Sequence, residues 1–319
     1  MHRRPSASRA YLLVAGISAG LACGEAPLQR ADPNFQATVA KPAYPKEKGP
    51  VILIDAAHSN FHTANGSYGP FAELLRNDGY VVRDSKDGFE SGLAGARVMV
   101  IANARGKNEM NDSSAFSAAE IAALHDWVQH GGSLLVIVDH YPMGSAARQL
   151  GLAFGVTIGD GMVEDSIAFD STSKDYSQLV FSRENGLLSE HSITAGRDTS
   201  ERLTRVVSFT GTALRGPPEA IQLLRLSRSA LTYSALPKIE KDGSTTRVIV
   251  TYGNPAPAFG KAQGLAFTVG EGRVVVLGEA AMLTAQIDRM GTAFGMSVAG
   301  TDDRQFVLNV AHWLSRVIN

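Results

Sequence analysis

The sequence predicts an α/β domain with a mostly parallel sheet and helices on both faces. Short apolar segments such as 51–55 (VILID) and 133–138 (SLLVIV) are continuous, which is typical of strands buried on both faces. Amphipathic segments alternate with them, as in βα units. The chain has 319 residues, of which 44% are hydrophobic and 19% charged. These values allow a large buried core and exclude a disordered chain or a polytopic membrane protein.

The elements follow one another from Pro50. A helix over 70–79 has Pro near its start and Gly at its end. Ser117 and Glu120 have the spacing of a capping box, which begins a second helix that ends at Gly131. The remaining expected strands are 80–83, 97–102, 247–252 and 273–277, and the remaining expected helices are 145–152 and 304–317. The stretch from about 160 to 245 is less regular, so we expect an irregular β-containing insertion there.

Residues 1–22 are predicted to be a signal peptide. Residues 1–9 carry three Arg and no acid, and the apolar run 10–22 is too short to span a bilayer, which needs about 20 residues. Cys23 is the only cysteine, and the preceding Leu-Ala resembles the end of a bacterial lipobox. We therefore expect lipidation at Cys23 and an exported, lipid-anchored protein on the periplasmic side of the cell envelope. Gly24 favours the outer membrane. The alternative is an ordinary signal peptide with an incidental Cys23.

The mature chain is predicted to have two parts. Residues 23–49 contain four Pro and no apolar periodicity, which is typical of a flexible tether. Residues 50–319 are expected to form a single domain. The chain has 30 Lys and Arg against 31 Asp and Glu, so no overall basic field attracts nucleic acid. Membrane contact is expected through the lipid anchor only.

Polar side chains follow several predicted strands, at the points where ligands bind in open parallel sheets. Titratable groups that gather in one place favour a catalytic or binding site. We expect Asp139, His140 and Glu279 to be catalytic residues. We expect Asp55, Asn60, Asn103 and Gln286 to bind the ligand.

Three histidines of this predicted edge form a candidate metal site. His58, His62 and His140, with Asp139 or Glu279, would supply a Zn²⁺ set with one open position. The alternatives are a metal-free functional pocket and a network of structural hydrogen bonds. A divalent metal such as Zn²⁺ is therefore the expected cofactor, if there is one. No nucleotide is implied, because the glycine-rich stretches lack dinucleotide-binding and P-loop spacing.

Two segments carry a family resemblance. The segment 131–140 (GGSLLVIVDH), preceded by 116–120 (FSAAE), resembles the strand before the active-site turn of class I glutamine amidotransferase-like domains. The segment 272–283 is similar to their late strand and acidic turn, and 189–196 resembles their H-P-I-T-x-G segment. The uncharacterised bacterial ThuA-like and gliding-motility-associated branches are the most similar. The resemblance covers about residues 50–317 and implies a flavodoxin-like, amidotransferase-like fold.

The same resemblance excludes one activity. The family's nucleophilic Cys is missing at the turn, where this chain has Asp139 and His140. The protein is therefore not expected to be a glutamine amidotransferase. The first hypothesis is a cell-envelope hydrolase with a His/Asp/Glu site, in which a metal-bound water or one activated by Asp139 attacks the substrate. The alternative is a non-catalytic module that binds a glycan or a protein. The expected ligand is a small molecule or a glycan.

Overall fold

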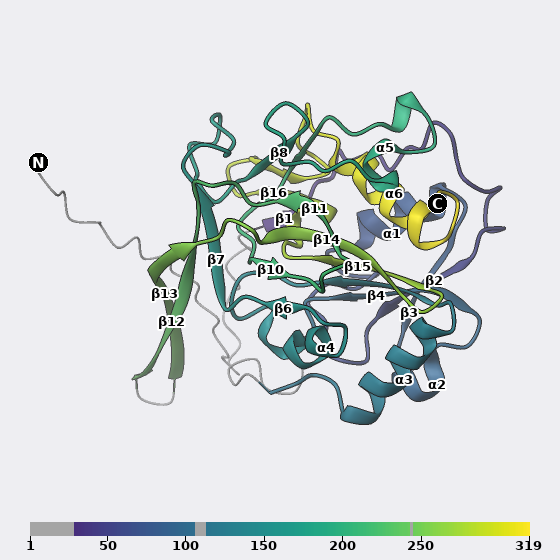
Figure 1. Cartoon of the computed structure of the whole chain (residues 1–319), viewed down its shortest axis with the longest axis horizontal. Helices are drawn as coiled ribbons and strands as arrows, with labels where there is room; N and C mark the ends of the chain where they lie inside the picture. The colour runs from purple at the N-terminus through teal and green to yellow at the C-terminus, as the bar shows by residue number, and fades with distance from the viewer. Residues whose placement is uncertain (1–28, 106–112, 243–244) are drawn as a thin grey trace, which may run out of the picture.

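The computed structural model describes residues 29–105, 113–242 and 245–319 (Figure 1). Strands make up 32% and helices 20% of the structure, in several antiparallel and mixed sheets. The prediction of a mostly parallel, flavodoxin-like sheet with helices on both faces is therefore wrong. The physical reason lies between residues 157 and 269, where the chain forms successive antiparallel strands instead of helical crossovers. The predicted signal peptide and Cys23 lie outside the described residues.

The largest sheet has nine strands. Its order is β3-β2-β4-β5-β15-β14-β10-β6, and β11 also pairs with β14. The bounds are β2 (Val51–Asp55), β3 (Val81–Ser85), β4 (Ala96–Ala102), β5 (Ser133–Ile137), β6 (Thr157–Ile158), β10 (Leu214–Arg215), β11 (Ile221–Arg225), β14 (Ala262–Val269) and β15 (Gly272–Leu277). The strands from β3 to β15 are parallel, and the others are antiparallel to their neighbours. The carboxyl ends of β2, β4, β5 and β15 therefore lie at one edge of the sheet.

Side chains of the parallel strands enter two separate hydrophobic cores. Ile52 and Ile54 of β2 share one core with helices α1 (Gly69–Asn77) and α6 (Asp303–Leu314). Leu53 between them belongs to the other core, with helix α3 (Ala118–Gln129). Successive side chains of a strand point to opposite faces, so a strand buried on both faces needs a continuous apolar run.

The remaining elements are short, apart from one hairpin. The other helical segments are α2 (Phe89–Gly92), α4 (Arg148–Ala153), α5 (Ser192–Ala195), η1 (Ser145–Ala147), η2 (Thr199–Glu201) and η3 (Ala281–Leu283). The other sheets combine β1 (Gln29–Ala31), β16 (Ala285–Asp288) and β17 (Ala293–Gly295); β7 (Gly161–Asp165), β12 (Ala230–Asp242) and β13 (Thr245–Pro257); and β8 (Val180–Ser182) and β9 (Arg205–Val207). Among the described residues, no helix has the length and apolar character needed to cross a membrane.

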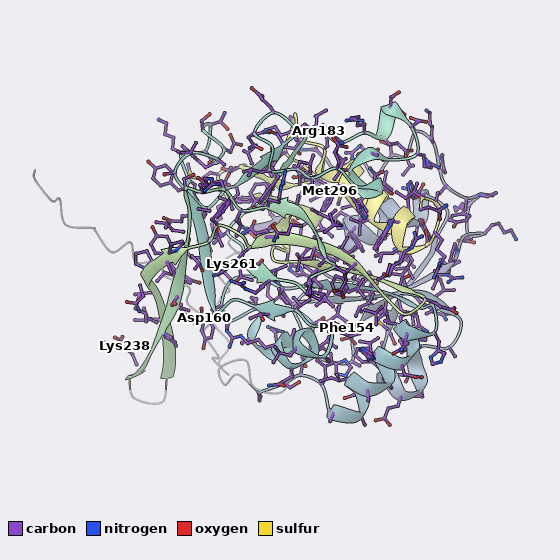
Figure 2. The ribbon with its side chains drawn as sticks, viewed as in Figure 1. Phe154, Asp160, Arg183, Lys238, Lys261 and Met296 are labelled. Carbon is purple, nitrogen blue, oxygen red and sulfur yellow. The ribbon has the colours of Figure 1, made fainter. Side chains whose placement is uncertain are left out.

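The hairpin of β12 and β13 projects from the body of the protein (Figure 1). Strand β7 pairs with β12 only over residues 230–234, so the outer part is a two-stranded ribbon. Lys238 stands on this outer part, far from the central sheet (Figure 2). At the base of the ribbon, Val250 and Tyr252 face a cavity described below.

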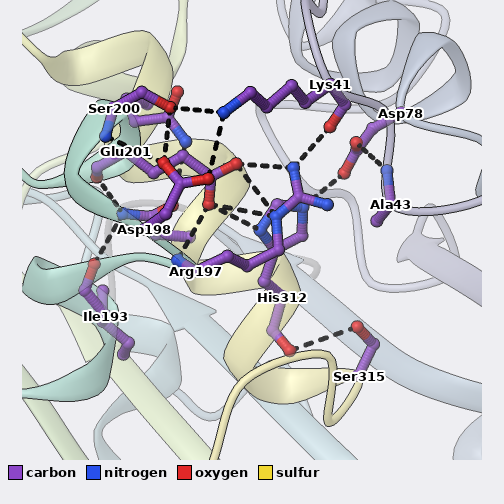
Figure 3. Close-up of polar contacts among 12 residues, drawn as sticks. Lys41, Ala43, Asp78, Ile193, Arg197, Asp198, Ser200, Glu201, His312 and Ser315 are labelled. Atoms are coloured by element: carbon purple, nitrogen blue, oxygen red, sulfur yellow. Dashed lines mark hydrogen bonds and ion pairs between the residues drawn. The ribbon is translucent and has the colours of Figure 1, made fainter.

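Residues 29–49 lie along the domain. Strand β1 pairs with β16, and Asn77 donates a hydrogen bond of 2.8 Å to the carbonyl of Ala37. The amide of Ala43 donates to the Asp78 carboxylate at 2.7 Å, and Lys41 pairs with Asp198 at 3.0 Å (Figure 3). These contacts pack this stretch, which is part of the predicted tether, against the domain. Its partners come from distant parts of the chain, so local composition gave no sign of them.

The same region contains a buried charge network (Figure 3). Nε2 of His312, on α6, lies 2.7 Å from Oδ2 of Asp78, which follows α1. Arg197 binds the Glu201 carboxylate through Nε and Nη2 and also donates to the carbonyl of Lys41. The network therefore joins the N-terminal segment, α1, η2 and α6.

Candidate functional site

The residues that follow the parallel strands form two polar clusters. The first cluster lies beyond β2 and centres on His58. The second lies beyond β5 and β15 and centres on His140. The predicted edge is thus divided between two histidines with different surroundings.

In the first cluster, His58 bridges two carboxylates. Its Nδ1 lies 2.9 Å from Oδ2 of Asp55, and its Nε2 lies 2.8 Å from Oε1 of Glu120. Asp55 is fully buried and also accepts hydrogen bonds from the Ala57 amide at 3.0 Å and the Asn60 side chain at 2.5 Å. Carboxylate oxygens only accept, so both ring nitrogens of His58 donate and the ring is a cation.

The pKa shifts agree with this assignment. Burial lowers the pKa of His58, but the hydrogen bonds and charges of Asp55 and Glu120 outweigh burial, and the pKa is raised above 6.5. Burial also raises the pKa of Glu120, yet the hydrogen bonds from Ser117 and His58 lower it overall. The imidazole packs against the rings of Phe89 and Phe116, with centroids 4.8 and 4.7 Å away, and the two phenyl rings also contact each other. This cluster is an ion triad that joins β2 to α3.

The first cluster does not fit a metal ion. A ligating imidazole needs one nitrogen free of a proton, and both nitrogens of His58 are engaged by carboxylates. Across the three described stretches, no three His, Cys, Asp or Glu side chains are placed to hold a metal. The predicted set of His58, His62 and His140 is not brought together. We therefore derive no metal chemistry here.

His62 is buried and neutral. Its Nδ1 lies 2.5 Å from Oγ of Ser67, and its ring stacks on the Tyr68 ring, with the two ring centroids 4.4 Å apart. Burial, together with the charge of Arg105, lowers the pKa of His62 to about 3. His62 is therefore a core histidine of the region that leads into α1.

The predicted ligand-binding residues are spread over this edge. Oδ1 of Asn60 accepts from the Ala102 amide at 2.8 Å, so Asn60 ties β2 to β4. Asn103 has a positive φ of 53°, and its Oδ1 has no hydrogen-bond partner in the part of the chain that is described. Gln286 lies on β16, where its backbone pairs with Ala31 and Phe294. Asp55, Asn60 and Asn103 thus lie together beyond β2 and β4, whereas Gln286 stands in a separate sheet.

In the second cluster, the protonation of His140 is determined by its neighbours. Nδ1 lies 2.7 Å from Oδ1 of Asp139 and 3.0 Å from the carbonyl oxygen of Thr210. Both partners only accept, so Nδ1 carries the proton in the neutral ring. Asp139 is held in turn by the amides of His140 at 2.7 Å and Ala280 at 3.3 Å. Within the described stretches no residue hydrogen-bonds to Nε2, which leaves that nitrogen available.

The electrostatics favour a protonated His140. Burial lowers the pKa of this imidazole, but the charge and hydrogen bond of Asp139 and the Thr210 carbonyl raise it above 6.5 overall. Glu279 is fully buried nearby, and burial together with the charge of Asp139 raises its pKa well above 4.5. The Glu279 carboxyl accepts from the amides of Ala281 at 2.6 Å and Met282 at 2.8 Å. Glu279 thus orders the turn after β15.

His140 lines a cavity of about 300 Å³. Other lining residues come from six separate segments and include Gln29, Gln178, Phe209, Tyr252 and Phe294. The Tyr252 ring lies 6.3 Å from that of His140, and its hydroxyl donates to the carbonyl of Tyr141 at 3.1 Å. A mainly apolar wall with a few polar groups is the usual composition of a small-molecule site.

Three contributing residues were missed by the sequence reasoning. Glu120 was assigned only as a helix cap, which it is, since Ser117 and Glu120 form the predicted capping box. Thr210 acts through its backbone carbonyl, which any residue type provides. Tyr252 lies in a predicted strand, but its place beside His140 depends on the fold of the hairpin. Glu279, expected to be catalytic, does not line the cavity.

No family model matches the chain, and no curated protein matches its sequence. Among solved structures it is similar to "mmIFT52 N-terminal domain", with a TM-score of 0.55 and 17% identity over 83% of this chain and 97% of that one. Two putative ThuA-like proteins are also structural neighbours. The one from Bacteroides uniformis has a TM-score of 0.40 and 14% identity, over 86% of this chain and 93% of that one. The one from Parabacteroides merdae has a TM-score of 0.44 and 12% identity, over 84% and 90%. The similarity to the mmIFT52 domain shows that the two chains share a fold. The structural neighbours also include ThuA-like proteins at low sequence identity.

Proposed function

We propose that this protein is a lipid-anchored hydrolase of the cell envelope, and that His140 is its general base. One observation carries the proposal: Nδ1 of His140 is committed to Asp139 and Thr210, so Nε2 is the basic atom at a cavity of about 300 Å³. A histidine held in one tautomer at the wall of a cavity has the geometry expected of a general base.

In this mechanism Nε2 of His140 removes a proton from a water molecule in the cavity. The water oxygen attacks the substrate, and the imidazolium then gives its proton to the leaving group. Asp139 keeps the ring oriented and stabilises the imidazolium without taking the proton. The raised pKa of His140 has the direction that this role requires, because the positively charged form is stabilised by Asp139. Glu279 is assigned as a positioning residue.

We also propose that this protein belongs to the ThuA-like branch of the class I glutamine amidotransferase-like proteins, whose members lack the nucleophilic Cys. The support is the segment 131–140, in which Asp139 and His140 stand at the turn where that family places its nucleophile. General-base hydrolysis uses a water molecule as the nucleophile, so it needs no thiol. The cell-envelope location rests on residues 1–23 of the sequence.

The test is a panel of p-nitrophenyl esters, phosphodiesters and glycosides, assayed from pH 5 to 9. Hydrolysis should rise with pH through a pKa above 6.5, because only neutral His140 accepts a proton. His140→Ala should lower kcat/KM by about 10² to 10⁴. His130→Ala is the matched control, since His130 is exposed at the end of α3. Hydrolysis that is unchanged in His140→Ala would refute the assignment.

A second function is favoured by the cavity wall. Phe209, Tyr252 and Phe294 provide aromatic surface, and Gln29 and Gln178 provide amides, which suit the mixed apolar and hydroxyl surface of a sugar. The protein would then be a non-catalytic glycan-binding module. Glycan binding that is lost in Tyr252→Ala, with no hydrolysis of any panel substrate, would favour this function over the hydrolase.

A further inference from the structure

A second and larger cavity lies at the other edge of the central sheet. The amino ends of β2, β4, β5 and β15 border a groove of about 980 Å³. Three arginines line it: Arg97 at the start of β4, Arg273 at the start of β15, and Arg316 after α6. Because His140 follows the carboxyl end of β5, the two sites lie at opposite ends of this strand.

The groove has an excess of positive charge. Against the three guanidinium groups, Glu271 is the one carboxylate among the described residues that line it. Burial and the charge of Arg316 lower the pKa of Arg273, so two like charges are held close enough to repel each other. An anion between the arginines would remove this repulsion.

Arg97 and Arg316 are each hydrogen-bonded to the protein but retain further N–H donors that could bind a ligand. Nη1 of Arg97 donates to the carbonyl of Gly131 at 3.2 Å, and Nη2 of Arg316 donates to the carbonyl of Glu271. A guanidinium has five N–H donors. In the described part of the chain, each of these two side chains directs a single donor to the protein. Such groups are oriented in advance for a ligand that accepts several hydrogen bonds.

The third arginine is the most firmly held. Nη1 of Arg273 donates to the carbonyls of Trp313 at 2.6 Å and Ile318 at 2.7 Å, and its guanidinium packs over the Trp313 ring at 5.0 Å. These contacts fix a cation in the wall of the groove. Trp127 and the glycines 131 and 132 also line the groove.

We propose that this groove is a binding site for a phosphate-bearing anion, held by Arg97, Arg273 and Arg316. The planar fork of arginine matches the oxygens of a phosphate group, and several such contacts give both affinity and orientation. The phosphate could belong to a soluble phosphate ester or to a lipid headgroup. In both cases the ligand presents a phosphate group to the three arginines of the groove, and Glu271 is the acidic residue of its lining.

The experiment uses the full chain with Cys23→Ser, so that acylation cannot attach it to a membrane. Pyrophosphate is titrated by calorimetry in about 50 mM salt, which is below physiological ionic strength and therefore screens the charges less. Arg97→Gln should weaken binding by about tenfold. Glu271→Gln should strengthen it by about two- to fivefold, because a repelling charge is removed. Lys238→Gln, on the projecting hairpin, removes one positive charge elsewhere and should leave the affinity unchanged.

A second arm identifies the source of the phosphate. The same variants are sedimented with vesicles of phosphatidylglycerol and phosphatidylcholine, or of phosphatidylcholine alone. Sedimentation with phosphatidylglycerol that is lost in Arg97→Gln supports the site and assigns a headgroup. Pyrophosphate binding without sedimentation supports the site and assigns a soluble ester. If neither probe binds, or if binding is the same in Arg97→Gln and Glu271→Gln as in the parent, the proposal is overturned.

Discussion

Replacing His58 tests whether the first cluster is an ion triad that stabilises the fold. His58→Ala removes the cation that both Asp55 and Glu120 contact. Asp55 is fully buried, and in the described stretches its remaining partners are neutral, namely the Ala57 amide and the Asn60 side chain. Removing one partner of a buried ion pair costs about 3–5 kcal/mol. The two remaining hydrogen bonds place the expected loss near the lower end, at about 3 kcal/mol of unfolding free energy.

The assay is urea unfolding followed by circular dichroism at pH 6. Glu120→Gln is the comparison variant, because Gln also forms a capping box and this side chain is partly exposed, so its cost should be about 1 kcal/mol. A loss below about 1 kcal/mol in His58→Ala would refute the ion triad. A loss in Glu120→Gln as large as that in His58→Ala would place the stabilisation in the contact between His58 and Glu120 instead of the buried contact with Asp55.

The difference in unfolding free energy between the parent and His58→Ala should also depend on pH, and the pKa shift of His58 gives the direction of that dependence. The pKa of His58 in the folded protein is raised above 6.5. The stability that it contributes is therefore fully present below pH 6.5 and is lost as the pH rises through the folded-state pKa. The free-energy difference between the parent and His58→Ala should be larger at pH 6 than at pH 9. An equal difference at both pH values would contradict a charged His58.

Two further predictions concern other parts of the chain. Gly196 has φ 70° and ψ −172°, and an added Cβ would lie 2.4 Å from the Glu201 Cβ. Gly196→Ala should therefore lower the unfolding free energy by about 2 kcal/mol or more. Gly186→Ala is its control in the same unfolding assay, since φ there is 71° and nothing lies within 4 Å; equal losses would show that the contact with Glu201 is unimportant. Cys23→Ser should move the protein from the membrane fraction to the soluble fraction of fractionated cells, and unchanged membrane association would contradict lipidation at Cys23.

Much of the parallel part of the fold could be predicted from the sequence. The run VILID becomes β2, and SLLVI becomes β5, because a strand buried on both faces needs apolar residues at every position. The capping box at Ser117 begins α3 as predicted. The antiparallel half could not be predicted, because β14 pairs with β15, β11 and β10 through contacts between segments whose local patterns do not specify their partners.

The candidate site was predictable only as a region. Polar residues after β2, β5 and β15 do lie at the ends of those strands. Whether an imidazole there is a ligand, a base or part of an ion pair depends on partners distant in sequence. His58 meets Glu120, 62 residues away, and His140 meets the carbonyl of Thr210, 70 residues away. Those two contacts distinguish a structural cation from a candidate general base.

Nitrogen NMR of the His140 ring as a function of pH tests directly whether His140 is the base of the cavity. The neutral ring should carry its proton on Nδ1 and its pKa should lie above 6.5, because Asp139 and the Thr210 carbonyl both accept from Nδ1. Asp139→Asn should lower that pKa, since the charge that raises it is removed. A neutral ring protonated on Nε2, or a pKa unchanged by Asp139→Asn, would contradict the assignment of His140 as the base of this cavity.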